Sequence, residues 1–128
     1  MNILLDTHVA LWAITNDPKL SINARNQIAS PRATVWVSVT SLWEIAIKFA
    51  LGRGDMPISG MDALNYFKDA GYSLLSIEPE HAIAVETLPH HHQDPFDRLL
   101  VAQALVEPMR LITHDATVAR YSDSIILV

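Results

Sequence analysis

Cysteine is absent from this 128-residue chain, which excludes disulfide scaffolds, thiol nucleophiles and thiolate zinc sites. Glycine occurs four times, never in the Gly-x-Gly-x-x-Gly spacing of a phosphate-binding loop. The chain has no Gly-x-Ser-x-Gly hydrolase elbow either. No apolar run approaches the roughly 20 residues that span a bilayer, and the N-terminus does not resemble a signal peptide. We therefore expect a cytoplasmic protein without membrane contact.

Basic residues are also scarce. Nine Lys and Arg against fourteen Asp and Glu give a net charge of −5, which excludes a protein held on nucleic acid mainly by its overall charge. Local binding through a metal or a basic rim stays open. A hydrophobic fraction of 50% excludes disorder, and the length predicts one domain, 1–128. The mean hydropathy of +0.20 favours a surface buried against a second copy or another protein.

Short apolar or β-branched runs alternate with longer segments of helical periodicity. Strands are expected at 3–5, 34–38, 73–76, 110–113 and 125–128. Helices are expected to begin near residues 7, 22, 41, 60, 79 and 95. Because strands separated by helices pair in parallel, the predicted fold is a three-layer α/β/α sandwich around a mainly parallel sheet.

Four acidic residues fall at related places in this scheme. Asp6 follows the first strand, and Asp115 comes two residues after the fourth. Glu44 and Asp97 fall in the expected first turns of two helices. The carboxyl edge of a parallel sheet carries the binding sites of open α/β folds. Carboxylates that converge there repel one another, and the oxygen ligands they offer suit Mg²⁺ or Mn²⁺.

Each acid also has a purely structural interpretation. Asp6 and Asp115 can be helix caps, and Ser41 with Glu44 matches a capping box. Asp94 can cap the helix that begins at Pro95, while Asp97 suits the positive end of its dipole. Capping does not require all of these acids on one edge of the sheet, so together they favour an acidic metal site.

Four segments resemble PIN-domain ribonucleases, above all the VapC-type toxins of bacterial toxin–antitoxin pairs. Two segments, Ile3-Leu4-Leu5-Asp6-Thr7-His8 and Leu111-Ile112-Thr113-His114-Asp115, place an acid after a strand. The more specific segments are Val39-Thr40-Ser41-Leu42-Trp43-Glu44-Ile45-Ala46-Ile47-Lys48 and Asp94-Pro95-Phe96-Asp97-Arg98-Leu99-Leu100-Val101-Ala102-Gln103-Ala104. The resemblance covers nearly the whole chain, in order.

The resemblance implies that Asp6, Glu44, Asp97 and Asp115 form an acidic pocket that holds one or two Mg²⁺ or Mn²⁺ ions and cleaves RNA phosphodiesters. It also implies a cognate antitoxin protein as partner, and a homodimer. Residues expected to support the acids from close by in sequence are Thr7, Ser41, Asp94 and Thr113.

Lys48, Arg53 and Arg98 lie near the acids in sequence and are candidates for contacts with RNA phosphates. The alternative for each is a solvated charge at a helix end. For the run His90-His91-His92 we favour a solvated loop over a transition-metal site, because neighbouring side chains point in different directions and no second ligand cluster is apparent.

The main alternative is a catalytically silent PIN-like module that acts only by binding a partner. A phosphoacceptor receiver domain is a further α/β fold with clustered acids. It requires paired acids after strand one, an Asp after strand three and a late Lys, and this sequence lacks all three.

Overall fold

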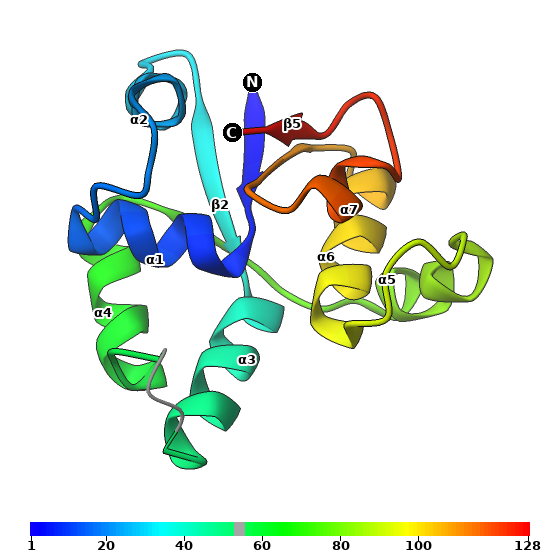
Figure 1. Ribbon diagram of the computed structural model, residues 1–128, viewed down its shortest axis with the longest axis horizontal. Helices are drawn as coiled ribbons and strands as arrows, with labels where there is room; N and C mark the ends of the chain where they lie inside the picture. Colours follow the sequence, from blue (N-terminus) through cyan, green and yellow to red (C-terminus); the bar gives the residue numbers. More distant parts are fainter. Residues whose placement is uncertain (53–55) are drawn as a thin grey trace.

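The computed structural model describes residues 1–52 and 56–128 (Figure 1). Within these residues, five parallel strands form one sheet in the order β3-β2-β1-β4-β5. The strands are β1 (Asn2–Leu5), β2 (Thr34–Ser38), β3 (Ser73–Leu75), β4 (Arg110–Thr113) and β5 (Ile126–Leu127). The predicted α/β class with a parallel central sheet is confirmed. The strand order reverses beside β1, which places a topological switch point between β1 and β4.

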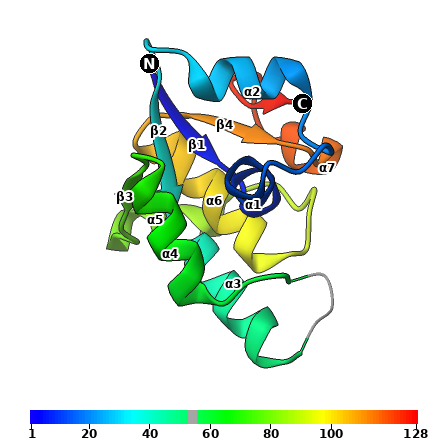
Figure 2. The same cartoon turned by 90° about the vertical axis from the view of Figure 1, so that its left-hand side faces the viewer.

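Helices lie on both faces of the sheet (Figures 1 and 2), and a hydrophobic cluster fills the space on each side. Alternation along β1 sends Ile3 and Leu5 into one cluster and Leu4 into the other, as the pleat requires. The first cluster includes α1 (Thr7–Thr15), α2 (Ile22–Ala29), α3 (Val39–Ala50) and α4 (Gly60–Asp69). The second includes α5 (Pro79–Ala84), the 3₁₀ helix η1 (Val85–Thr87), α6 (Pro95–Val106) and α7 (Ala116–Ala119).

Side-chain caps set the beginnings of several helices. Asp6 Oδ1 accepts from the Val9 amide at 2.9 Å, Ser21 Oγ from Ala24 at 3.1 Å, and Asp94 Oδ1 from Phe96 at 2.8 Å. These caps agree with the expected starts at residues 7, 22 and 95. Within the described residues, no helix is both long enough and apolar enough to traverse a bilayer.

The start of α3 differs from our expectation. Ser38 Oγ accepts from the Thr40 amide at 2.9 Å, so α3 begins at Val39 and not at Ser41. Val39 and Thr40 are β-branched, a residue type with low helix propensity, and they nevertheless form the first turn of α3. Ser41 therefore lies inside the helix, and Glu44 lies beyond the first turn, in which we had expected it. The alternative interpretation of Ser41 and Glu44 as a capping box is thereby excluded. The side chains of Ser41 and Glu44 are buried and face α1, where both lie within hydrogen-bonding distance of Thr7.

A buried polar cluster joins α6 to the end of β2 and the start of α3. Gln103 Oε1 accepts from Ser38 Oγ at 2.5 Å and from Thr40 Oγ1 at 3.0 Å. All three side chains are fully buried, and Gln103 Nε2 donates to the Ser76 carbonyl at 3.3 Å. Hydrogen bonds among buried groups have directional requirements that apolar packing lacks. The cluster therefore fixes the position of α6, which carries Asp97, relative to α3, which carries Glu44.

Candidate active site

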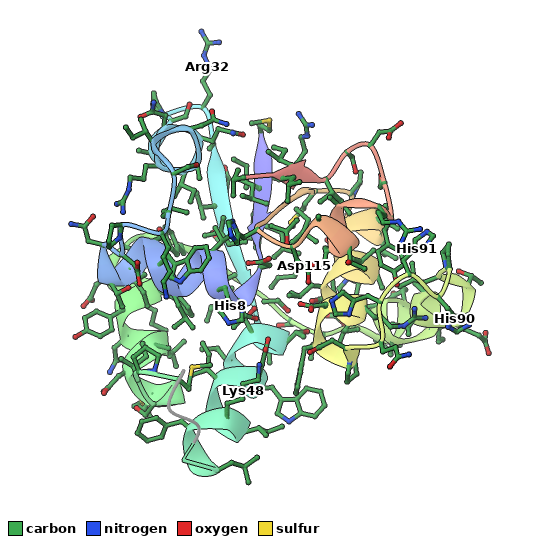
Figure 3. The ribbon with its side chains drawn as sticks, viewed as in Figure 1. His8, Arg32, Lys48, His90, His91 and Asp115 are labelled. Atoms are coloured by element: carbon green, nitrogen blue, oxygen red, sulfur yellow. The ribbon has the colours of Figure 1, made fainter. Side chains whose placement is uncertain are left out.

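The acidic residues meet in a pocket of about 520 Å³ at the carboxyl edge of the sheet. β1 and β4 are neighbours in the sheet, so the residues that follow them are brought together at the switch point. In Figure 3 Asp115 faces this region from above, with His8 and Lys48 on the side of α1 and α3. The residues that line the pocket are Asp6, His8, Trp12, Glu44, Lys48, Asp94, Asp97, His114, Asp115 and Ala116.

Asp6 is deeply buried, with 6% of its surface exposed. Its Oδ1 caps α1, while its Oδ2 accepts a hydrogen bond from the Thr113 hydroxyl of β4. Burial raises the pKa of Asp6, and the bonds from Thr113 and Val9 only partly oppose that rise. The Thr113 hydroxyl also accepts from the Asp115 amide at 3.0 Å, so one side chain links the two acids.

Asp115 likewise uses its two oxygens differently. Oδ1 caps α7, accepting from Thr117 at 2.8 Å, and Oδ2 lies 2.9 Å from His92 Nε2. Burial works against ionisation of this carboxyl. The bonds from His92 and from the amides of Thr117 and Val118 outweigh it and lower the pKa of Asp115.

Glu44 enters the pocket from α3. The Thr7 hydroxyl donates to Glu44 Oε1 at 2.6 Å and lies 3.0 Å from Ser41 Oγ. Lys48, one turn further along α3, donates to Glu44 Oε2 at 2.6 Å. Ser41 thus lies near Glu44, its neighbour in sequence, whereas Thr7, which follows Asp6 in sequence, bonds to Glu44 instead. Lys48 is therefore paired with a pocket carboxylate.

Asp97 projects from the first turn of α6 toward the other acids. Burial raises its pKa to about 7, with further contributions from the charges of Asp94, Asp6 and Glu44. Its carboxyl therefore keeps its proton to near neutral pH. Asp94 lines the same pocket, and its Oδ1 caps α6 by accepting from Phe96 and from Asp97.

His92 is a pocket neighbour that sequence reasoning missed. Its Nε2 lies 2.9 Å from Asp115 Oδ2 and 3.4 Å from Asp97 Oδ2. One ligand atom from each of these three residues lies within 4.8 Å of the others. His90 and His91 lie away from the pocket, as Figure 3 shows, and His91 packs edge-on against Tyr121. The available signal was the position of His92 in the loop directly before the helix that carries Asp97.

Arg98 has a different environment from the phosphate contact we anticipated. Only 9% of its surface is exposed, and its guanidinium donates to the carbonyls of Pro89 at 2.9 Å and Val85 at 3.2 Å. It also donates to the Tyr121 hydroxyl at 3.1 Å. In this structure Arg98 holds the loop that contains His92. Arg53 lies outside the described residues.

These side chains are suited to a hard divalent cation. The pocket combines several carboxylate oxygens with a buried Asp6 and with an Asp97 whose pKa is raised to about 7 by burial and by the neighbouring carboxylates. Oxygen-rich, anionic sites of this kind prefer Mg²⁺ or Mn²⁺. Divalent ions bound in such pockets activate water and neutralise phosphate charge.

Comparison with known proteins places the chain in a family. The PIN domain matches residues 3–123, and the chain belongs to the PIN domain family. No curated protein matches it.

Solved structures with the same fold come from several bacteria. A chain of VapBC2 from Rickettsia felis, bound to a DNA fragment from the promoter, has a TM-score of 0.72 at 17% identity, covering 100% of this chain and 98% of that one. A chain of DNA-bound VapBC from Salmonella typhimurium has a TM-score of 0.68 at 16% identity, covering 100% and 97%. A chain of a toxin–antitoxin complex from Klebsiella pneumoniae has a TM-score of 0.64 at 15% identity, covering 97% and 95%.

Proposed function

We propose that this protein is a divalent-metal-dependent endoribonuclease and the toxin of a toxin–antitoxin pair. The observation that carries the proposal is the convergence of Asp6, Glu44, Asp97 and Asp115 on one pocket at the switch point of the sheet. Membership of the PIN domain family supports nuclease activity, and a fold shared with chains of VapBC complexes supports the toxin role.

In this proposal Asp6 and Asp97 hold one or two Mg²⁺ or Mn²⁺ ions directly, and Glu44 and Asp115 hold them directly or through water. Thr113 fixes the Asp6 carboxylate by its hydrogen bond to Oδ2. Thr7 does the same for Glu44 through Oε1. Such support around ligands raises metal affinity because the ligand geometry is already set before the ion arrives.

The chemistry that such an ion supplies when bound is activation of water and neutralisation of charge on the phosphate. One of the pocket carboxylates orients the attacking water and takes its proton. Lys48, at the edge of the pocket with 22% of its side chain exposed, is positioned to contact RNA phosphate. Because water and not the 2′-hydroxyl attacks, the products are a 5′-phosphate and a 3′-hydroxyl.

The partners in this proposal are RNA, a cognate antitoxin and a second copy of the chain, all in the cytoplasm. Several large apolar side chains on and beside α3 and α4 are exposed, as expected of surfaces that another protein covers. They are Trp43 (52% exposed), Phe49 (47%), Leu51 (65%) and Met61 (67%). Light scattering of the purified chain, alone and co-expressed with the product of the adjacent gene, tests both assemblies.

The decisive experiment is RNA cleavage with Mg²⁺ or Mn²⁺, with a chelator as control, for the wild type, Asp6→Asn and Asp123→Asn. Asp123 is exposed and lies outside the pocket, so its substitution controls for the change in charge. We expect cleavage by the wild type and Asp123→Asn, and none by Asp6→Asn. Cleavage in chelator, or a cyclic 2′,3′-phosphate product, would contradict the mechanism. Partner binding without metal-dependent cleavage would identify a silent PIN-like module.

A further inference from the structure

His92 is held beside the pocket by its own loop. Its amide donates to the Tyr121 hydroxyl at 2.9 Å, and Arg98, which binds the Pro89 carbonyl, lies 3.4 Å from the His92 carbonyl oxygen. Its side chain is 20% exposed. The ring therefore occupies one fixed place beside the carboxylates, with both nitrogens engaged by protein groups.

The contacts of the two ring nitrogens determine the tautomer. Nδ1 lies 3.0 Å from the Asp94 amide nitrogen, which can only donate, so Nδ1 must accept and carries no proton. In a neutral imidazole the proton then resides on Nε2. The acceptor for that proton is Asp115 Oδ2 at 2.9 Å, and Asp97 Oδ2 lies 3.4 Å away on the same side.

This tautomer conflicts with metal ligation by His92. A metal ion at Nε2 needs the lone pair of that nitrogen, which moves the proton to Nδ1. There it would point at the Asp94 N–H, so two donors would face each other at the beginning of α6. Proximity to Asp97 and Asp115 alone would group all three residues as ligands, whereas the hydrogen bonds separate the histidine from the two acids.

We propose that His92 is a positioning residue whose Nε2–H holds the Asp115 carboxylate beside Asp97, and that His92 is not itself a metal ligand. The inference deepens the proposed metal-dependent function and rests on the acidic pocket described for it. The backbone of the Asp94-Pro95 turn fixes the imidazole, and the imidazole fixes Asp115. Metal-site support of this kind changes affinity by about 10- to 100-fold when it is removed.

The tautomer can be measured without any metal. In protein labelled with ¹⁵N-histidine, long-range ¹H–¹⁵N correlation spectra distinguish protonated from unprotonated ring nitrogens, and His92→Gln identifies the His92 signals by their loss. We expect Nε2 to be protonated and Nδ1 to be bare. A proton on Nδ1 would overturn the inference.

Manganese binding tests whether His92 positions the Asp115 carboxylate. The variants are His92→Ala, His92→Gln, whose amide can donate to Asp115 in place of Nε2–H, and His90→Ala as an exposed control from the same loop. We expect Mn²⁺ affinity to fall about 10- to 100-fold in His92→Ala. We expect substantial rescue in His92→Gln and no change in His90→Ala. Equal losses in both His92 variants, or none in either, would overturn the role as donor.

Pulsed electron paramagnetic resonance of the Mn²⁺-loaded wild type completes the test. We expect no coupling from a directly bonded ¹⁴N, and such a coupling that disappears in His92→Gln would show His92 to be a ligand. Failure of this inference is distinguishable from failure of the proposed function. RNA cleavage that needs Asp6 can coexist with a His92–manganese bond, and a correct tautomer can coexist with a protein that cleaves no RNA.

Discussion

Replacing Asp97 by Asn should make the metal-free protein more stable near neutral pH, although it removes a proposed metal ligand. In the folded protein, burial and neighbouring carboxylates raise the pKa of Asp97 from 3.8 to about 7. Each pKa unit corresponds to about 1.36 kcal/mol. The full shift is therefore equivalent to about 4 kcal/mol. The 24% exposure of the side chain and proton sharing among the acids reduce this, so we expect a gain of about 1–4 kcal/mol.

The sign of the pH dependence follows from proton uptake. Between about pH 4 and pH 7 the folded chain binds a proton at Asp97 that the unfolded chain has released. This contribution to the free energy of unfolding is fully present below about pH 4 and is lost as pH rises through about 7. The wild type in chelator should therefore weaken over that interval, and Asp97→Asn should weaken less.

Urea unfolding in chelator at pH 5 and pH 7.5, repeated with excess Mn²⁺, measures these differences. An ion at 100 times its dissociation constant stabilises the folded state by about 2.7 kcal/mol, and this stabilisation should be confined to proteins that retain Asp97. Asp123→Asn serves as the matched control and should follow the wild type. The reasoning is refuted if Asp97→Asn is less stable than the wild type at pH 7.5 in chelator, or if both lose stability equally between the two pH values.

Three further substitutions test the surroundings of the pocket. Thr113→Val removes the hydroxyl that donates to Asp6, so Mn²⁺ affinity measured by calorimetry should fall about 10- to 100-fold, and unchanged affinity would contradict its role. Lysine in Arg98→Lys cannot make the several buried hydrogen bonds that the guanidinium donates to the loop, so the free energy of unfolding should drop by about 2–3 kcal/mol. A drop below about 0.5 kcal/mol would refute this account. Gln103→Leu leaves two buried hydroxyls without their acceptor, so the free energy of unfolding, measured by chemical denaturation, should fall by about 1–3 kcal/mol. An unchanged free energy of unfolding would contradict this account.

The elements that sequence reasoning located well are those with strong local signals. Asp94 and Pro95 mark the start of α6 by chemistry confined to four residues. The short runs at β2 and β4 are mostly buried and rich in β-branched, aliphatic or aromatic residues, and their bounds agree with expectation. α7 was not anticipated, because four residues are too few for a hydrophobic period to show. Its only local signal was its cap, Asp115.

The placement of Asp6 and Asp115 followed from topology, whereas the particular hydrogen bonds that join the acids to distant residues did not. A strand followed by an acid predicts a position on the sheet edge, and the parallel order then brings Asp6 and Asp115 together. The bond from Thr113 to Asp6 joins residues 107 positions apart, and that from His92 to Asp115 joins residues 23 apart. Such contacts depend on loop geometry and side-chain rotamers, which the hydrophobic periodicity of the sequence does not predict.

Capping and metal binding are compatible functions for the same carboxylate. Asp6 and Asp115 each use Oδ1 to accept from backbone amides at the start of a helix, which leaves Oδ2 directed to other partners. Asparagine retains a carbonyl oxygen that caps nearly as well as aspartate, but it lacks the negative charge. Substitution by asparagine at either site therefore removes charge while preserving the helix start. Substitution by alanine removes both, and costs about 0.5–2 kcal/mol for the lost cap. A loss of activity in an alanine variant would consequently not separate folding from chemistry, whereas the asparagine variants do.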